Sequence, residues 1–223
     1  MLLHPCRRWQ NPLVSITRRQ FEQMQERLGG ALASAKPGSR HTAAPVFTTT
    51  LRAAPGAQCV ILGVDPSLRG TGFGVIRIAK PHPVALAHGT ISCPASWERS
   101  RCLVTISQTL REVLREYKPT VCVVEGLFYA QNLQTALIMG EARGAALATV
   151  AEAGLDIYEI ATRKVKQAIV GHGAAQKSAV AKMIQRLLNL SKPPAPDAAD
   201  ALALALAHAQ ENSRYNLTPL KKI

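Results

Sequence analysis

The sequence feature that most limits the possible folds of this chain is the pattern of its apolar residues, which changes after residue 58. Five short apolar runs are bounded by Gly, Pro or charged residues, which is typical of buried strands. These runs cover residues 59–64, 73–78, 84–91, 121–125 and 157–160. The first three follow one another through tight turns, so they predict an antiparallel meander.

Helical spacing of apolar residues fills the intervals between the later runs and continues after the last one. We expect helices at 103–117, 132–153, 162–170, 177–189 and 197–210. Strands that are joined by helices make parallel crossovers. The sequence therefore predicts an α/β fold with a five-stranded mixed sheet, three antiparallel strands followed by parallel ones, flanked by helices.

The first 58 residues differ from the rest in composition. They contain eight of the 27 Lys and Arg residues but only two acidic residues, and they are rich in Pro, Ser and Thr. We expect a disordered basic extension at 1–58, a folded domain at 59–211 and a flexible tail at 212–223. A misassigned start codon, an organellar transit peptide and a basic nucleic-acid arm each fit this extension.

The net charge and the cysteines indicate the kind of partner and the cellular compartment to expect. The formal net charge of +13 favours a polyanionic partner, most often nucleic acid. Five cysteines without a Cys-x-x-Cys pair indicate neither a zinc site nor a disulfide framework, which favours a reducing, cytoplasmic setting. A transit peptide at the N-terminus would instead place the chain in an organelle. The sequence predicts no membrane association, because no apolar run is long enough to span one.

Acidic residues are scarce, and four of them occupy informative positions. Asp65 ends the first predicted strand and Glu125 ends the fourth, while Asp197 and Asp200 lie three residues apart at the start of the last helix. If strands one and four are neighbours, one helix packed across them brings the four carboxylates together. Divalent cations such as Mg²⁺ offset the repulsion within such a cluster and can promote phosphodiester hydrolysis as a pair. The alternative is a structural role for each, as a turn residue or a helix cap.

Several segments match a known family in order and spacing. They are Ile-Leu-Gly-Val-Asp-Pro at 61–66, Val-Glu-Gly-Leu-Phe at 124–128, Gly-Glu-Ala-Arg-Gly at 140–144, Lys-Val-Lys-Gln at 164–167, Gln-Lys-Ser at 176–178 and Asp-Ala-Ala-Asp-Ala-Leu-Ala at 197–203. Together they resemble the RuvC family of Holliday-junction resolvases over residues 59–210. The resemblance implies an RNase H-like fold and a homodimer that resolves four-way DNA junctions by paired symmetric nicks, in recombination and DNA repair.

The resemblance also assigns roles to residues. It implies that Asp65, Glu125, Asp197 and Asp200 bind Mg²⁺, with Mn²⁺ as a substitute and two ions per subunit, and that Lys166 and Lys177 assist catalysis. It implies that Phe128 contacts bases near the junction centre. It further implies that the RuvA and RuvB branch-migration complex is a partner.

The residues support parts of this assignment on their own. A lysine near the scissile phosphate stabilises developing negative charge, and an exposed aromatic can stack on an unpaired base. Other candidates for DNA contact, chosen for charge and position, are Arg69, Arg77, Lys164 and His172. For each of these residues, an ordinary solvated or packed position is the alternative.

Small residues recur every fourth position in the 132–153 helix, at Ala136, Gly140, Gly144 and Ala148. They permit close approach of a second helix, which favours dimerisation, or close packing on the chain's own sheet. Two other functions also stay open. One is a nucleotide-binding protein of the actin and sugar-kinase type, whose sheet also begins with a strand-end Asp and a glycine turn. The other is a non-catalytic junction-binding module.

Overall fold

The computed structural model describes residue 23 and residues 59–126, 132–213 and 220–223. Its strands are β1 (Val60–Asp65), β2 (Gly70–Arg77), β3 (Val84–Ser92), β4 (Val121–Glu125), β5 (Asp156–Ile160) and β6 (Lys221–Lys222). They form one sheet in the order β3-β2-β1-β4-β5-β6. The β1–β4 and β4–β5 pairs are parallel, and the other three pairs are antiparallel. The predicted meander and the mixed sheet are confirmed.

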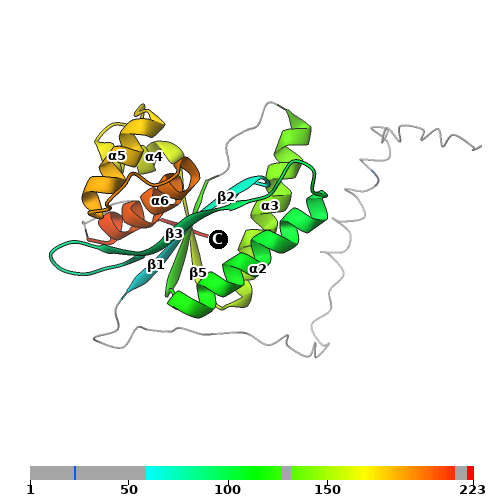
Figure 1. Cartoon of the computed structure of the whole chain (residues 1–223), viewed down its shortest axis with the longest axis horizontal. Helices are drawn as coiled ribbons and strands as arrows, with labels where there is room; N and C mark the ends of the chain where they lie inside the picture. The colour runs from blue at the N-terminus through cyan, green and yellow to red at the C-terminus, as the bar shows by residue number, and fades with distance from the viewer. Residues whose placement is uncertain (1–22, 24–58, 127–131, 214–219) are drawn as a thin grey trace, which may run out of the picture. The chain divides into compact units, whose positions relative to one another are not determined.

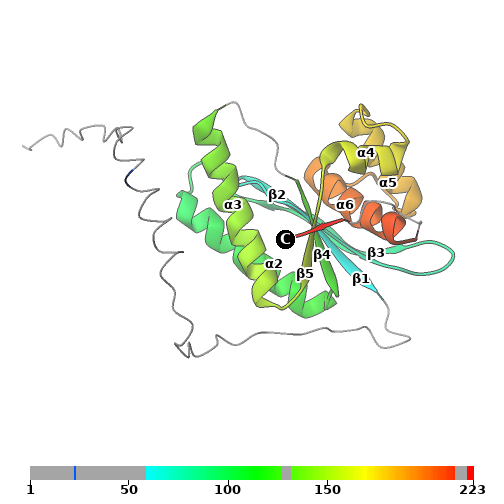
Figure 2. The ribbon, with the colours of Figure 1, turned by 180° about the vertical axis from the view of Figure 1, so that it is seen from behind.

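Helices cover both faces of the sheet (Figures 1 and 2). One face carries α2 (Arg99–Tyr117) and α3 (Leu133–Glu152). The other carries α4 (Thr162–Val170), α5 (Lys177–Leu187) and α6 (Pro196–Ser213). Because side chains alternate along a strand, β1 feeds both cores: Leu62 packs toward α2 and α3, and Ile61 packs toward α4, α5 and α6. None of the described helices is long and apolar enough to cross a bilayer.

Within the described residues the sheet has six strands, so the prediction of five was wrong. The additional strand, β6, lies within the segment that was expected to be a flexible tail. It pairs with β5 through Lys221 opposite Glu159, and the Ile223 amide donates to the Ile157 carbonyl at 3.0 Å. Two consecutive lysines carry no apolar signal, so the sequence pattern could not reveal this strand.

Helix α6 lies unusually close to β1 and β2, because glycines face it from the sheet. A Cβ atom added at Gly63 would lie 2.0 Å from the Ala201 carbonyl oxygen, and one at Gly72 would lie 2.0 Å from the Asp197 carbonyl oxygen. Only glycine permits this approach of two backbones. The contact fixes the height of α6 above the sheet, and with it the position of Asp200.

Candidate active site

The site lies where β1 and β4 end side by side. Asp65 is the last residue of β1 and Glu125 is the last residue of β4. The two strands are parallel neighbours with Val64 opposite Val124, so both carboxylates emerge at the same edge of the sheet. Asp200 reaches this place from α6, and the three carboxylates line one cavity together with Thr162 and Lys166. The expected adjacency of strands one and four is confirmed.

The electrostatics of Asp65 show how close the carboxylates are. Burial, followed by the charges of Glu125 and Asp200, raises the pKa of Asp65 from 3.8 to about 7, while Lys177 acts in the opposite direction. Like charges near a half-buried carboxyl favour its protonated form. The three carboxylates therefore lie close enough for their charges to interact.

Glu125 is held by a residue that the sequence analysis missed. The Thr162 hydroxyl, at the first residue of α4, donates to Glu125 Oε1 at 2.5 Å. This hydrogen bond limits rotation of the Glu125 side chain. The only signal in the sequence was a hydroxyl residue two positions after the fifth strand, where the next helix is expected to begin.

Both candidate catalytic lysines border the carboxylates. Lys177 Nζ lies 2.9 Å from Asp200 Oδ2. This hydrogen bond and the charge of Asp200 raise the pKa of Lys177, with further contributions from Asp65 and Asp197. Lys166 comes from α4 and lines the same cavity. The lysines therefore lie where they can reach a phosphate that approaches the carboxylates.

Asp197 takes a different place from the other three acids. It lies in the first turn of α6 above β2, and its carboxylate is close to Gly70. It is not among the residues that line the cavity. Its charge still reaches Lys177, so it belongs to the same electrostatic neighbourhood.

The candidates for DNA contact are scattered. Lys164 on α4 and His172 just after this helix are both exposed. Arg77 pairs with Val60 at the opposite end of β1 from Asp65, so it lies away from the carboxylates. Arg69 donates to the Pro94 and Trp97 carbonyls at 2.6 and 3.1 Å, which gives it a structural role. Phe128 lies outside the described residues.

The donors at this site are all carboxylate oxygens, which suit a hard divalent cation such as Mg²⁺. After burial, the charges of Glu125 and Asp200 raise the pKa of Asp65, and a bound cation would offset that repulsion. As the side chains stand, no three His, Cys, Asp or Glu residues in the described part of the chain enclose a common point closely enough to form a metal centre. Asp200 gives one oxygen to Lys177 instead. The residues therefore fit the ion in their chemistry, without forming a complete coordination shell.

A mixed sheet with helices on both faces and acidic residues at the ends of two central parallel strands defines the RNase H-like class of α/β proteins. The family model for crossover junction endodeoxyribonuclease RuvC matches residues 61–208. The RuvC of Protochlamydia amoebophila is 45% identical over 154 residues, which are 69% of this chain and 92% of that protein. The RuvC of Bordetella avium is 44% identical over 161 residues, 72% of this chain and 89% of its own length.

A solved structure agrees with these relatives. The RuvC of Thermus thermophilus, determined in complex with a Holliday junction substrate, matches with a TM-score of 0.68 and 31% identity over 74% of this chain and 99% of that one. The chain belongs to the RuvC family of crossover junction endodeoxyribonucleases.

Proposed function

We propose that this protein resolves four-way DNA junctions by hydrolysing two phosphodiester bonds at symmetric positions, in recombination and DNA repair. The observation that carries the proposal is the convergence of Asp65, Glu125 and Asp200 in one cavity on a family scaffold. A Thermus thermophilus relative in complex with a Holliday junction supports the choice of substrate. The net charge of +13 suits a DNA partner.

In this proposal Asp65, Glu125 and Asp200 hold Mg²⁺, with Asp197 completing the set and Mn²⁺ able to substitute. Two such ions supply an activated water and stabilisation of the leaving oxygen. Thr162 keeps the Glu125 carboxylate in one orientation. Lys177 releases Asp200 and, with Lys166, stabilises the negative charge that develops on the scissile phosphate.

The exposed side of α3 supports a homodimer. Gly140 and Gly144 have open space where a Cβ would lie, so the small residues do not pack on the chain's own sheet. Leu133 and Leu137 on the same helix are 75% and 59% exposed. A second copy would cover this apolar surface and place two active sites about a two-fold axis, as the pseudo-symmetry of a junction requires. Sedimentation at micromolar protein should show a dimer, and a monomer alone would contradict this.

We extend the proposal to the cellular setting. The expected partners are the RuvA and RuvB branch-migration proteins, and the expected compartment is the cytoplasm, with residues 1–58 acting as an extension to the nuclease domain. A transit function of this extension would move the enzyme to an organelle. Expression of the full chain fused to a fluorescent protein, beside a version that begins at residue 59, distinguishes a cytoplasmic location from an organellar one.

The Asp65→Asn variant tests the assignment of the site. It keeps the shape of the side chain and removes its charge, so it should bind a junction normally and fail to cleave it in Mg²⁺. Cleavage at the wild-type rate by a purified D65N protein would exclude Asp65 from the chemistry.

A further inference from the structure

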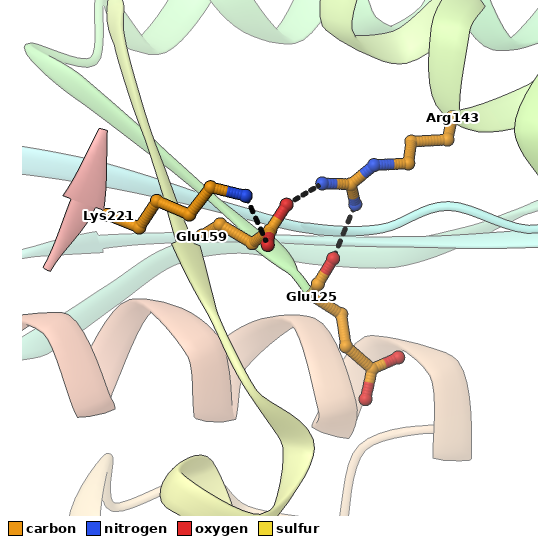
Figure 3. Close-up of polar contacts among 4 residues, drawn as sticks. All are labelled: Glu125, Arg143, Glu159 and Lys221. Atoms are coloured by element: carbon orange, nitrogen blue, oxygen red, sulfur yellow. Dashed lines mark hydrogen bonds and ion pairs between the residues drawn. The ribbon is translucent and has the colours of Figure 1, made fainter. Parts of the chain in front are cut away.

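Arg143 is a charged residue in the interior, on the face of the sheet opposite to the active-site cavity. It belongs to α3 and is only 6% exposed. A guanidinium is rarely buried unless its charge and its donors are satisfied. Two acceptors bind it here: one nitrogen donates to the main-chain carbonyl of Glu125, and another donates to Glu159 Oε2 at 2.6 Å, which also pairs its charge (Figure 3).

These two acceptors lie on neighbouring strands. Glu125 ends β4 and pairs with Ile160, the residue after Glu159 on β5. The planar fork of one arginine therefore joins the ends of both strands. Figure 3 shows that the Glu125 side chain leaves the strand on the other side from Arg143. Arg143 thus holds the main chain of the residue whose carboxylate lines the active-site cavity.

The C-terminal strand reaches the same cluster. Lys221 pairs with Glu159 in the ladder, and its Nζ lies 3.2 Å from Glu159 Oε1. Glu159 therefore gives one oxygen to Arg143 and the other to Lys221 (Figure 3). This places the carboxylate between α3 and β6 and restricts its rotation.

We propose that Arg143 is a positioning residue for catalysis. It fixes the end of β4 so that the Glu125 carboxylate points into the cavity, while β6, through Lys221 and Glu159, keeps the guanidinium in place. This inference rests on the proposed function only in taking Glu125 as a functional carboxylate. The C-terminal strand then contributes to the active site without touching it.

The first test separates positioning from general stability. In the Arg143→Met/Glu159→Leu double variant, apolar side chains replace a buried ion pair, and such replacements often preserve stability. Neither side chain can donate to the Glu125 carbonyl. The matched control is Arg111→Met/Glu152→Leu, which removes an exposed pair between α2 and α3 whose atoms lie 3.0 Å apart.

We expect the buried-pair variant to unfold within a few degrees of the wild type and to bind a junction with a Kd changed less than about twofold. Its single-turnover cleavage should be slower by about tenfold or more, because small displacements of catalytic groups are costly. Hydrogen exchange at the end of β4, measured without metal or DNA, should be faster by about tenfold. The exposed-pair control should match the wild type in both the cleavage rate and the hydrogen exchange at β4. Wild-type exchange and cleavage in the folded buried-pair variant would overturn the proposal.

Arg143→Lys provides a second route if the double variant does not fold. It retains the charge opposite Glu159, but an ammonium lacks the planar fork that serves two acceptors. Slower cleavage and faster exchange at β4 support the proposal, and wild-type values of both contradict it. If the wild-type protein cleaves no junction, the proposed function fails, yet the exchange measurement still decides the role of Arg143.

The role of β6 has its own matched pair. Lys221→Met removes the cation on Glu159, whereas Lys222→Met removes one that pairs with Asp156 at 2.7 Å, at the start of β5. Because Lys221 is exposed, the increase in exchange at the end of β4 should be modest, about two- to fivefold, in K221M and absent in K222M. Equal exchange in the two variants would exclude Lys221 from the arrangement.

Discussion

Substituting Gly63 by alanine should disturb the fold and the active site together. The new Cβ would lie 2.0 Å from the Ala201 carbonyl oxygen and 3.1 Å from the Ala205 amide nitrogen, both in the backbone of α6. A backbone cannot rotate away as a flexible side chain can, so the whole helix must move. Overpacking of this kind costs about 2–3 kcal/mol.

The cost can be measured by thermal unfolding. For a chain of this size each kcal/mol lowers Tm by roughly 2–4 °C, so the G63A variant should unfold about 4–12 °C below the wild type. Because α6 carries Asp200, junction cleavage in Mg²⁺ should also fall well below the wild-type rate at temperatures where G63A is folded. Gly126→Ala is the control, since a Cβ there meets its nearest neighbours at 3.5 Å, an ordinary contact. A Tm of G63A equal to that of G126A would refute the close approach of α6.

Three other predictions concern the carboxylates. The pKa of Asp65 is about 7, against 3.8 for the free side chain. Between these pH values the folded chain keeps a proton that the unfolded chain loses. Without metal, the unfolding free energy should therefore decrease as the pH rises from 3.8 to about 7. Calorimetry should show that the unfolding free energy of D65N changes less with pH over this range than that of the wild type. The same dependence on pH in both proteins would contradict this. Thr162→Val should slow cleavage about tenfold with junction binding unchanged, while T162S stays near the wild type; equal rates of the two variants would remove Thr162 from the site. Lys177→Met should slow cleavage about 100-fold, and a similar loss in K182M, an exposed lysine of the same helix, would show a general effect of charge.

The sequence predicts most of this fold because its signals are local. The apolar runs at β1 and β4 end at Asp65 and Glu125, and the rule that parallel strands end at one edge brings these acids together. The helices predicted at 132–153 and 162–170 match α3 and α4 to within a residue at each end.

What the sequence does not predict depends on contacts between distant segments. The place of Arg143 could not be foreseen, because an arginine within a helix usually lies on the surface, and its acceptors come from β4 and β5. Thr162 was missed because its acceptor, Glu125, lies on β4, 37 residues earlier in the chain. Arg69 and Arg77 were chosen for charge and position along the chain; the structure gives the first a structural role and places the second at the opposite end of β1 from Asp65.

The central claim is that this chain cuts four-way junctions with these carboxylates. The most direct test is a synthetic junction with a short mobile core, labelled on each strand in turn, incubated with the full chain and Mg²⁺ and resolved on denaturing gels beside linear duplex and the Asp200→Asn variant. We predict nicks at symmetric positions on two opposed strands, absent on the duplex and lost in D200N. Cleavage of the duplex as readily as the junction, or undiminished cleavage by D200N, would contradict the account.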